Sequence, residues 1–341
     1  MTKEEHKDDA LEPAWRALES GDVRAARKLA GKVADDDPDG LLLLAACSRE
    51  EDDLDAAVRY LERAVAADGE WATPELWLAE VFAQNPDRLE DARRHATRAL
   101  DLADDEGEYL SSLALKAGLE LELGREQEAR RTLADLPPGE LPLGDPDAAL
   151  EIADLHLALG ETELARDRLR TLAKGQPDSA DVWHALGCAA ADLGDEQEMR
   201  EAWKRAWALD AAAGATADRP RRLEDADVEA VAEAALDELP ERARELLEGV
   251  PVVVAELPAE SDVEAGVDPR SLGLFSGTAY PDKSNLGGQD GLSQIILFRR
   301  NLERVSGDED ELREEVRATL LHETGHFFGM DDAELEDVGL G

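Results

Sequence analysis

Two histidines and a glutamate stand together near the C-terminal end of the sequence. Residues 322–332 read HETGHFFGMDD, so His322 and His326 are four positions apart and Glu323 follows the first of them. Side chains four positions apart on a helix point from the same face, so one nitrogen from each histidine can reach a single metal ion. Glu323 then lies beside the metal rather than on it, which is where a general base is needed.

A glycine and two aspartates follow the second histidine and extend the pattern. Gly329 permits a sharp backbone turn after the helix, and this turn would bring Asp332 back to supply a third ligand. Asp331 is an alternative third ligand, although the motif spacing favours Asp332. Two nitrogens and one oxygen suit Zn²⁺, and three protein ligands leave a fourth position for water, as in catalytic zinc sites. The sequence therefore predicts a zinc site formed by His322, His326 and Asp332, with Glu323 as the catalytic base.

An amphipathic helix is predicted to carry this motif, and a few strands to support it. Residues 306–309 (SGDE) are typical of a capped helix start. Apolar residues then recur at helical spacing, at Leu312, Val316 and Leu320. Further upstream, residues 223–248 have helical spacing with a break at Pro240. Apolar and alternating runs predict strands at Val250–Leu257, Leu272–Tyr280 and Ser293–Arg299.

The stretch between the first and last of these strands, residues 258–291, is rich in Gly, Pro, Asp and Ser. It is long for a connection, so it is either a lid over the metal or a disordered flap. If the strand at Ser293–Arg299 lies at the sheet edge, it is expected to align an extended substrate. Tyr280, Arg299 and Arg300 are candidates to stabilise an oxyanion. Packing or surface roles are the favoured interpretation for these three, because nothing in the sequence fixes their geometry.

The first two thirds of the chain have a different organisation, an internal repeat. Small or apolar residues recur at intervals of 31, 35, 37, 36 and 34, at Ala26, Ala57, Ala92, Ala129, Ala165 and Met199. A second series follows seven residues behind, at Val33, Ala64, Ala99, Leu136, Leu172 and Ala206. Such spacing predicts about six pairs of antiparallel helices over residues 10–211, with small residues where paired helices cross.

Residues 181–210 show the repeat best, through Trp183, Leu186-Gly187, Gly194-Asp195, Trp203, Ala206 and Asp210. This stretch resembles the tetratricopeptide repeat family. The resemblance implies a solenoid whose concave surface binds a protein partner. A generic alanine-rich helical solenoid is the alternative.

The repeat region contains no evident chemistry. His95, His156 and His184 stand at unrelated helix positions and are interpreted as packing or surface residues rather than ligands. Cys47 and Cys188 lie in Ala- and Leu-rich helical patterns, where a cysteine usually acts as a small buried hydrophobe.

The region from Leu223 to Gly341 resembles a family of small bacterial zincin-like metallopeptidases. The residues that carry the resemblance are Leu236–Pro240, Val252–Glu256, Leu272–Phe275, Ile295–Arg299 and Glu314–Asp332. It implies His322, His326 and Asp332 as zinc ligands and Glu323 as catalyst. The region differs from the larger metzincins, whose third ligand is a histidine.

Charge limits the partners. The chain has 81 acidic and 37 basic residues in 341, a net charge of −44, which disfavours nucleic acid and anionic membrane surfaces. No apolar stretch is long enough to span a membrane, and the charged N-terminus, Met1–Pro13, does not suit a secretory signal, so a cytoplasmic location is expected. The negative field favours substrates with Lys or Arg, a preference that salt should weaken.

We therefore expect a two-domain α+β protein. An all-α tetratricopeptide-like domain is predicted at 1–215, a linker at 216–222, and a small α+β zincin-like domain at 223–341. The expected function is zinc-dependent hydrolysis of peptide bonds, with the repeats recruiting protein substrates or partners. The alternative is a non-catalytic, repeat-based adaptor with a vestigial or structural zinc site, and inhibition of the peptidase by the solenoid is a third hypothesis.

Overall fold

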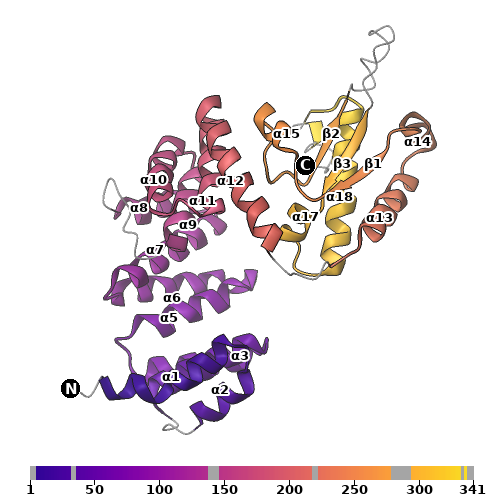
Figure 1. Ribbon diagram of the computed structural model, residues 1–341. Coiled ribbons are helices and arrows are strands. Elements are labelled where there is room, and N and C mark those ends of the chain that lie inside the picture. The colour runs from indigo at the N-terminus through magenta and orange to yellow at the C-terminus, as the bar shows by residue number, and fades with distance from the viewer. Residues whose placement is uncertain are drawn as a thin grey trace. The chain divides into compact units, whose positions relative to one another are not determined.

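The chain is an α+β protein made of two compact units, Met1–Pro177 and Asp178–Gly341 (Figure 1). The computed structural model describes residues 5–31, 36–136, 146–216, 222–277, 293–331 and 334–335. In the described part of the first unit all regular structure is helical. The described part of the second unit combines helices with a three-stranded sheet.

The first unit is a succession of helices that mostly pack against their neighbours along the chain. They are α1 (Glu5–Glu19), α2 (Val23–Ala30), α3 (Pro38–Glu50), α4 (Leu54–Ala67), α5 (Ala72–Ala83), the short 3₁₀ helix η1 (Pro86–Arg88), α6 (Leu89–Leu102), α7 (Glu106–Glu122), α8 (Glu126–Ala134), α9 (Pro146–Ala158) and α10 (Thr162–Gly175). Helix α9 instead packs against α7 and α10. This arrangement confirms the predicted helical repeat.

The repeated small residues lie at the crossings of paired helices. Five members of the first series are fully buried, Ala26, Ala57, Ala92, Ala129 and Ala165. Described members of the second series are buried as well, Ala64, Ala99, Leu136, Leu172 and Ala206. Met199, which departs from the small-residue pattern, is only partly buried, and Val33 lies outside the described residues. The recurrence of alanine thus results from close helix packing, because a larger side chain at an alanine position would push the helices apart.

Glycine turns separate the helices within several pairs. Gly124, Gly160 and Gly194 each have a φ of 71°, a conformation that side chains resist. Asp52 takes the equivalent turn with a φ of 57°. In the third pair Asn85 replaces the glycine, and its side chain accepts a hydrogen bond from the Asp87 N–H at 3.0 Å at the start of η1.

The second unit begins with the best-matching repeat, the pair α11 (Ala180–Asp192) and α12 (Glu196–Thr216). The two helices cross closely at Gly187, where a Cβ would lie 2.1 Å from the Trp203 ring. The sequence analysis assigned this pair to the repeats, but it forms one compact unit with the sheet region. Residues 217–221 of the predicted linker lie outside the described residues.

The sheet region follows with α13 (Asp225–Asp237), α14 (Glu241–Leu247), β1 (Val252–Ala255), α15 (Glu260–Ala265), β2 (Gly273–Ser276), β3 (Gln294–Phe298), α17 (Arg299–Val305) and α18 (Glu309–Phe327). The strand order is β1-β3-β2, with β1 parallel and β2 antiparallel to β3. The core forms where apolar residues of α13, β3, α17 and α18 meet, among them Val228, Ile295, Leu302 and Val316. These contacts hold α18 against the sheet.

The helices predicted within 223–248 and the three predicted strands are confirmed, with shorter bounds. The sequence analysis missed α15 and α17, which are only six and seven residues long. The structure does not meet the condition under which Ser293–Arg299 would align a substrate, because β3 is the middle strand of the described sheet and β2 is one of the two outer ones. Sheet order depends on pairing between distant segments, which strand patterns do not report.

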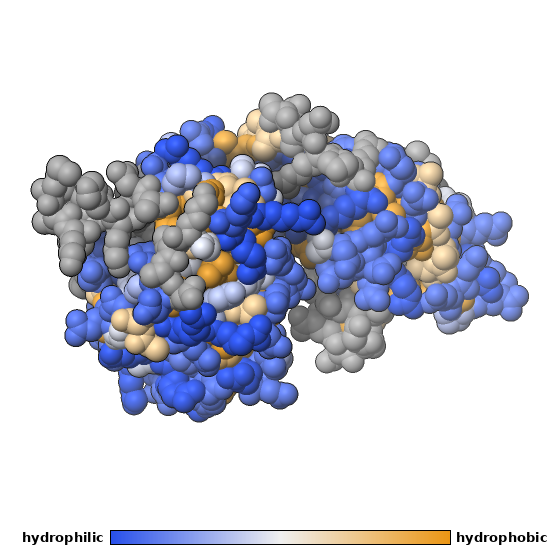
Figure 2. All heavy atoms as spheres, turned by 90° about the horizontal axis from the view of Figure 1, so that it is seen from below, coloured by the Kyte–Doolittle hydropathy of each residue, from blue (hydrophilic) through white to orange (hydrophobic). Residues whose placement is uncertain are grey.

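A mostly hydrophilic surface agrees with the high content of charged residues. The face drawn in Figure 2 is mostly hydrophilic, with apolar residues visible in small areas between charged ones. Within the described ranges, no helix is both long and apolar enough to cross a membrane.

Candidate metal centre

Helix α18 carries the HETGH sequence and is fixed at both ends. At its start the Asp308 side chain accepts hydrogen bonds from the N–H groups of Asp310 and Glu311, both at 2.9 Å. The Glu311 carboxylate accepts in turn from the Gly307 N–H at 2.6 Å. The cap is therefore Asp308, two residues after the Ser306 at which the sequence pattern begins. Together these bonds satisfy N–H groups that a helix start leaves without partners.

The helix ends in a glycine turn that also orients a histidine. Gly329 has a φ of 84°, and Met330 donates its N–H to the Gly325 carbonyl at 3.1 Å, which forms a Schellman motif. This turn places the Met330 carbonyl 3.0 Å from Nδ1 of His326. Since a carbonyl only accepts, Nδ1 carries the proton and Nε2 is left as the ligand atom.

His322 and His326 point their Nε2 atoms at the same place, 3.0 Å apart. Two nitrogens bound to one tetrahedral zinc ion at about 2.0–2.1 Å would be about 3.3 Å apart. The observed separation differs from that value by a few tenths of an ångström, so small side-chain rotations suffice. The two imidazoles therefore fit a shared metal ion.

Glu323 lies next to this pair and is almost fully buried, with 6% of its surface exposed. Its Oε2 accepts a hydrogen bond from the backbone N–H of Phe275 in β2, at 2.5 Å. Strand β2 comes this close because Gly273 has no side chain. A Cβ there would lie 2.7 Å from Cγ2 of Thr319 and 2.9 Å from Cγ of Glu323. The strand thus holds the carboxylate in one orientation.

A cavity of about 630 Å³ opens between β2 and the histidine face of α18. Its lining from α18 includes His322, Glu323 and His326, and its other wall is Ser271–Phe275. Arg317 and Glu315 lie on the same helix at the cavity, and Arg317 donates to Glu238. The candidate ligands and the candidate base therefore face one space large enough for part of a peptide.

The third ligand stays a prediction, because Asp332 lies outside the described residues. The alternative ligand, Asp331, uses its Oδ1 to accept the Glu334 N–H at 2.9 Å. Leu335 is buried against α18 at Gly325, where a Cβ would meet its Cδ2 at 2.2 Å. The chain therefore returns to α18 after the Gly329 turn.

The two arginines considered for an oxyanion role do not line the cavity. Arg299 is buried and pairs with the carboxylates of Asp225, Glu256 and Glu303, while Arg300 donates to the Asp210 carbonyl at 2.7 Å. Burial lowers the pKa of Arg299, but these carboxylates outweigh that effect and raise it overall. Both arginines serve packing, and Tyr280 lies outside the described residues.

Sequence reasoning missed the contribution of β2 to this site. The Phe275 N–H is a main-chain group and leaves no trace in a residue pattern. Gly273 did carry a signal, because a glycine inside a strand pattern often marks a close backbone approach. Phe327 is fully buried and packs edge-on against the Phe275 ring, with centroids 5.8 Å apart.

Residues 247–340 match the family model of zincin-like metallopeptidases, which confirms the expected resemblance of this region. No curated protein matches the sequence. Solved structures similar to the helical part include PilF of Pseudomonas aeruginosa, at 18% identity over 60% of this chain and 92% of that chain, with a TM-score of 0.48. The type IV pilus biogenesis factor PilW is similar at 16% identity over 62% of this chain and 94% of that chain, with a TM-score of 0.46.

Proposed function

We propose that the chain is a zinc-dependent metallopeptidase whose zinc is held by His322, His326 and Asp332. The observation that carries the proposal is the convergence of two Nε2 atoms, 3.0 Å apart, beside a buried glutamate on a cavity wall. The match of residues 247–340 to the zincin-like family supports it. When bound, zinc would polarise the scissile carbonyl and lower the pKa of water.

Glu323 is the proposed base. Its carboxylate takes a proton from the attacking water and passes it to the nitrogen of the leaving amine. The N–H of Phe275 fixes the carboxylate at 2.5 Å, so the base is oriented before substrate arrives. The cavity wall restricts the water that reaches it.

Strand β2 is the proposed guide for the substrate. It pairs with β3 on one side, and alternate residues of a strand direct their N–H and C=O groups to opposite sides. The Phe275 N–H points toward Glu323 rather than β3, so Gly273, two residues earlier, also directs its backbone groups toward the cavity side. An extended peptide can pair with the backbone groups of Gly273 and with the Phe275 carbonyl as an added strand. The net charge of −44 favours peptides with Lys or Arg.

The test compares Glu323→Gln with wild type. Zinc content is measured by metal analysis of the purified protein, and cleavage is measured with a peptide library rich in Lys and Arg. We expect one zinc in this site in both proteins and a loss of cleavage of about 10²- to 10⁴-fold in the variant. Glu315→Gln is the matched control, since Glu315 lines the same cavity on the same helix, and it should cleave like wild type.

Two results would count against the proposal. Equal cleavage by wild type and Glu323→Gln, with zinc retained, would favour the non-catalytic adaptor. Retention of all zinc in the double variant His322→Gln/His326→Gln would show that the metal binds elsewhere. The repeats are proposed to recruit protein substrates or partners, and the zinc test does not depend on that role.

A further inference from the structure

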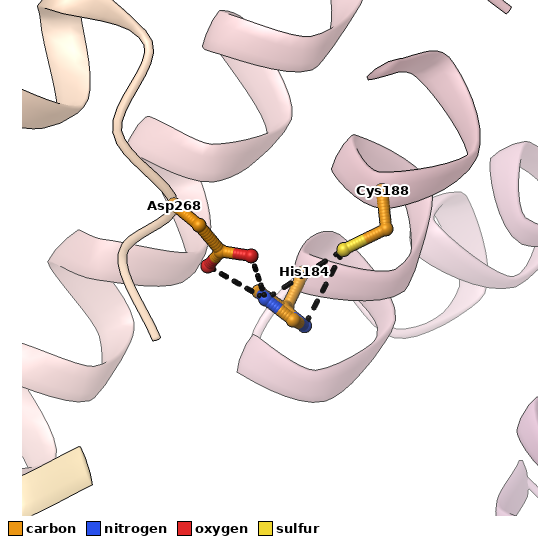
Figure 3. Close-up of side chains that lie close together, drawn as sticks. All are labelled: His184, Cys188 and Asp268. Atoms are coloured by element: carbon orange, nitrogen blue, oxygen red, sulfur yellow. Dashed lines mark hydrogen bonds and ion pairs between the residues drawn. The ribbon is translucent and has the colours of Figure 1, made fainter. Parts of the chain in front are cut away.

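A second group of metal-ligand side chains lies in the same compact unit, outside the cavity described above. His184 and Cys188 are one turn apart on α11, and Asp268 lies in the loop after α15 (Figure 3). Their ligand atoms all lie within 4.8 Å of one another. The sequence analysis interpreted this histidine and this cysteine as packing residues, because their spacing shows nothing of an aspartate 84 positions away.

The distances are close to those of a tetrahedral site. Nε2 of His184 lies 2.9 and 3.2 Å from the two Asp268 oxygens and 3.7 Å from Sγ of Cys188. Around one zinc ion with Zn–N and Zn–O near 2.0 Å and Zn–S near 2.3 Å, the nitrogen would be about 3.3 Å from the oxygen and about 3.5 Å from the sulfur. The sulfur also lies 3.9 Å from Nδ1, almost as near as to Nε2, so binding the ion would require the imidazole or the thiol side chain to rotate until Nε2 and Sγ point at one position.

The loop that carries Asp268 is held in place by its own hydrogen bonds. Oδ1 of Asp268 accepts from the Arg270 N–H at 2.7 Å, which orients the carboxylate. The buried Asn301 side chain donates to the carbonyls of Pro269 and Ser271 at 2.9 and 2.7 Å. Such supporting bonds are typical of metal sites, where they fix the direction of the ligands. The helix fixes the other two ligands.

The donor set suits zinc. A thiolate, a carboxylate and a neutral imidazole together carry a charge of about −2, which a divalent cation neutralises. Thiolate and imidazole ligands favour zinc over magnesium or calcium, which prefer oxygen. The side chains of His184 and Asp268 are 22% and 34% exposed, so an ion can enter and a water can complete the coordination.

Without a metal the same atoms form an ion pair. Burial lowers the pKa of His184, but the hydrogen bonds with Asp268 and Cys188 outweigh it and raise this pKa to about 9. A bound cation would take the position between the imidazole and the carboxylate that the proton holds in the metal-free protein. An ion pair alone, however, does not call for the thiol of Cys188 beside the imidazole, 3.7 Å from Nε2.

We propose that His184, Cys188 and Asp268 bind a second zinc ion, with water as the fourth ligand, that joins α11 to the loop leading into β2. The loop runs from Asp268 to Gly273, where β2 begins. The ion would therefore restrain the strand whose Phe275 N–H orients Glu323. Zinc binding by these three residues does not depend on peptidase activity.

Cobalt provides the test, because thiolate bound to Co²⁺ gives a charge-transfer band in the near ultraviolet that imidazole and carboxylate do not. The full chain, stripped of metal by a chelator, is titrated with Co²⁺. We expect wild type to show the band, Cys188→Ser to lose it, and Asp268→Asn to bind this Co²⁺ at least about 10- to 100-fold more weakly.

The chain offers two controls. Cys47→Ser removes the only other cysteine, which is fully buried in α3, and should keep the band. His322→Gln disables the centre proposed for catalysis and should keep the band as well, so failure of one site is distinguishable from failure of the other. A wild type without the band, or a band lost in Cys47→Ser and kept in Cys188→Ser, would overturn the proposal.

A measurement on unaltered protein covers the case in which a variant does not fold. Zn²⁺ should slow alkylation of Cys188 at least about tenfold, because a metal-bound thiolate is a poorer nucleophile. Peptide mass spectrometry reads Cys47 and Cys188 separately in one sample. An alkylation rate of Cys188 that does not change with saturating Zn²⁺ would also refute the site.

Discussion

The contact between β2 and α18 at Gly273 can be tested with a single methyl group. In Gly273→Ala the new Cβ would lie 2.7 Å from Cγ2 of Thr319 and 2.9 Å from Cγ of Glu323. Carbon atoms pack at about 3.5 Å or more, so the strand and the helix must separate by roughly 0.8 Å. Overpacking of this kind costs about 1–3 kcal/mol of folding free energy.

The same displacement should act on the candidate base. The Phe275 N–H is 2.5 Å from Glu323, and a shift of nearly 1 Å would weaken that bond and turn the carboxylate. A misplacement of about 1 Å can cost about 10²-fold in rate, so we expect kcat/KM to fall by about 10- to 100-fold. Zinc content should not change, since the two histidines face the cavity one and two turns from the contact with Thr319.

The assays are urea unfolding followed by circular dichroism, metal analysis, and cleavage of a peptide identified from the library. Gly69→Ala is the control, because a Cβ there meets only the Val65 carbonyl, at an ordinary 3.7 Å. It should change the unfolding free energy by no more than about 0.5 kcal/mol. If Gly273→Ala matched wild type in both unfolding and cleavage, the close approach of β2 to Glu323 would be refuted.

Two further predictions concern charged groups that the metal centre does not use. Asp210 is buried and accepts from the side chains of Arg270 and Arg304, so Asp210→Ala should destabilise the second unit by about 2–4 kcal/mol in urea unfolding. Asp178→Ala should be nearly neutral, because the Asp178 side chain, which pairs with Arg205, is 88% exposed. In the first unit, burial lowers the pKa of His156 below its usual 6.5 despite the Glu161 carboxylate. The unfolded chain then takes up the proton first, so stability should fall as pH drops below about 6.5, and His156→Gln should flatten this dependence in urea midpoints measured between pH 7.5 and 5.5.

The repeat and helix α18 were predictable because their signals are local. Ala57, Ala92 and Ala129 recur at similar intervals because each occupies the same place in a pair of packed helices. All three are fully buried. The end of α18 was predictable because Gly329 adopts a backbone conformation that few other residues tolerate. In both cases the residue type is restricted by the geometry at its own position, by the space between helices for alanine and by the backbone φ for glycine.

The groups that complete each site were not predictable, because they come from distant segments. Glu323 and the Phe275 N–H are 48 residues apart, and His184 and Asp268 are 84 apart. No periodicity connects them, and the order β1-β3-β2 that brings β2 to the cavity is decided by tertiary pairing. From sequence alone, an isolated histidine on a helix such as His184 is therefore interpreted as a packing residue. Only the structure identifies its partner from another segment.

The last repeat belongs structurally with the zincin-like region, which bears on how that region can be isolated. Asp210, the final residue of the best repeat pattern, accepts from Arg270 in the loop before β2 and from Arg304 in α17. The Trp207 indole N–H also donates to the Pro258 carbonyl at 2.9 Å. A fragment that began near residue 220 would lose these acceptors and donors. It would remove the carboxylate partners Asp181 and Asp210 from Arg270, whose side chain is only 15% exposed, at a cost in folding free energy. A fragment that begins at residue 178 keeps them all, so a comparison of its cleavage with that of the full chain would test inhibition by the preceding repeats without disturbing the wall of the cavity.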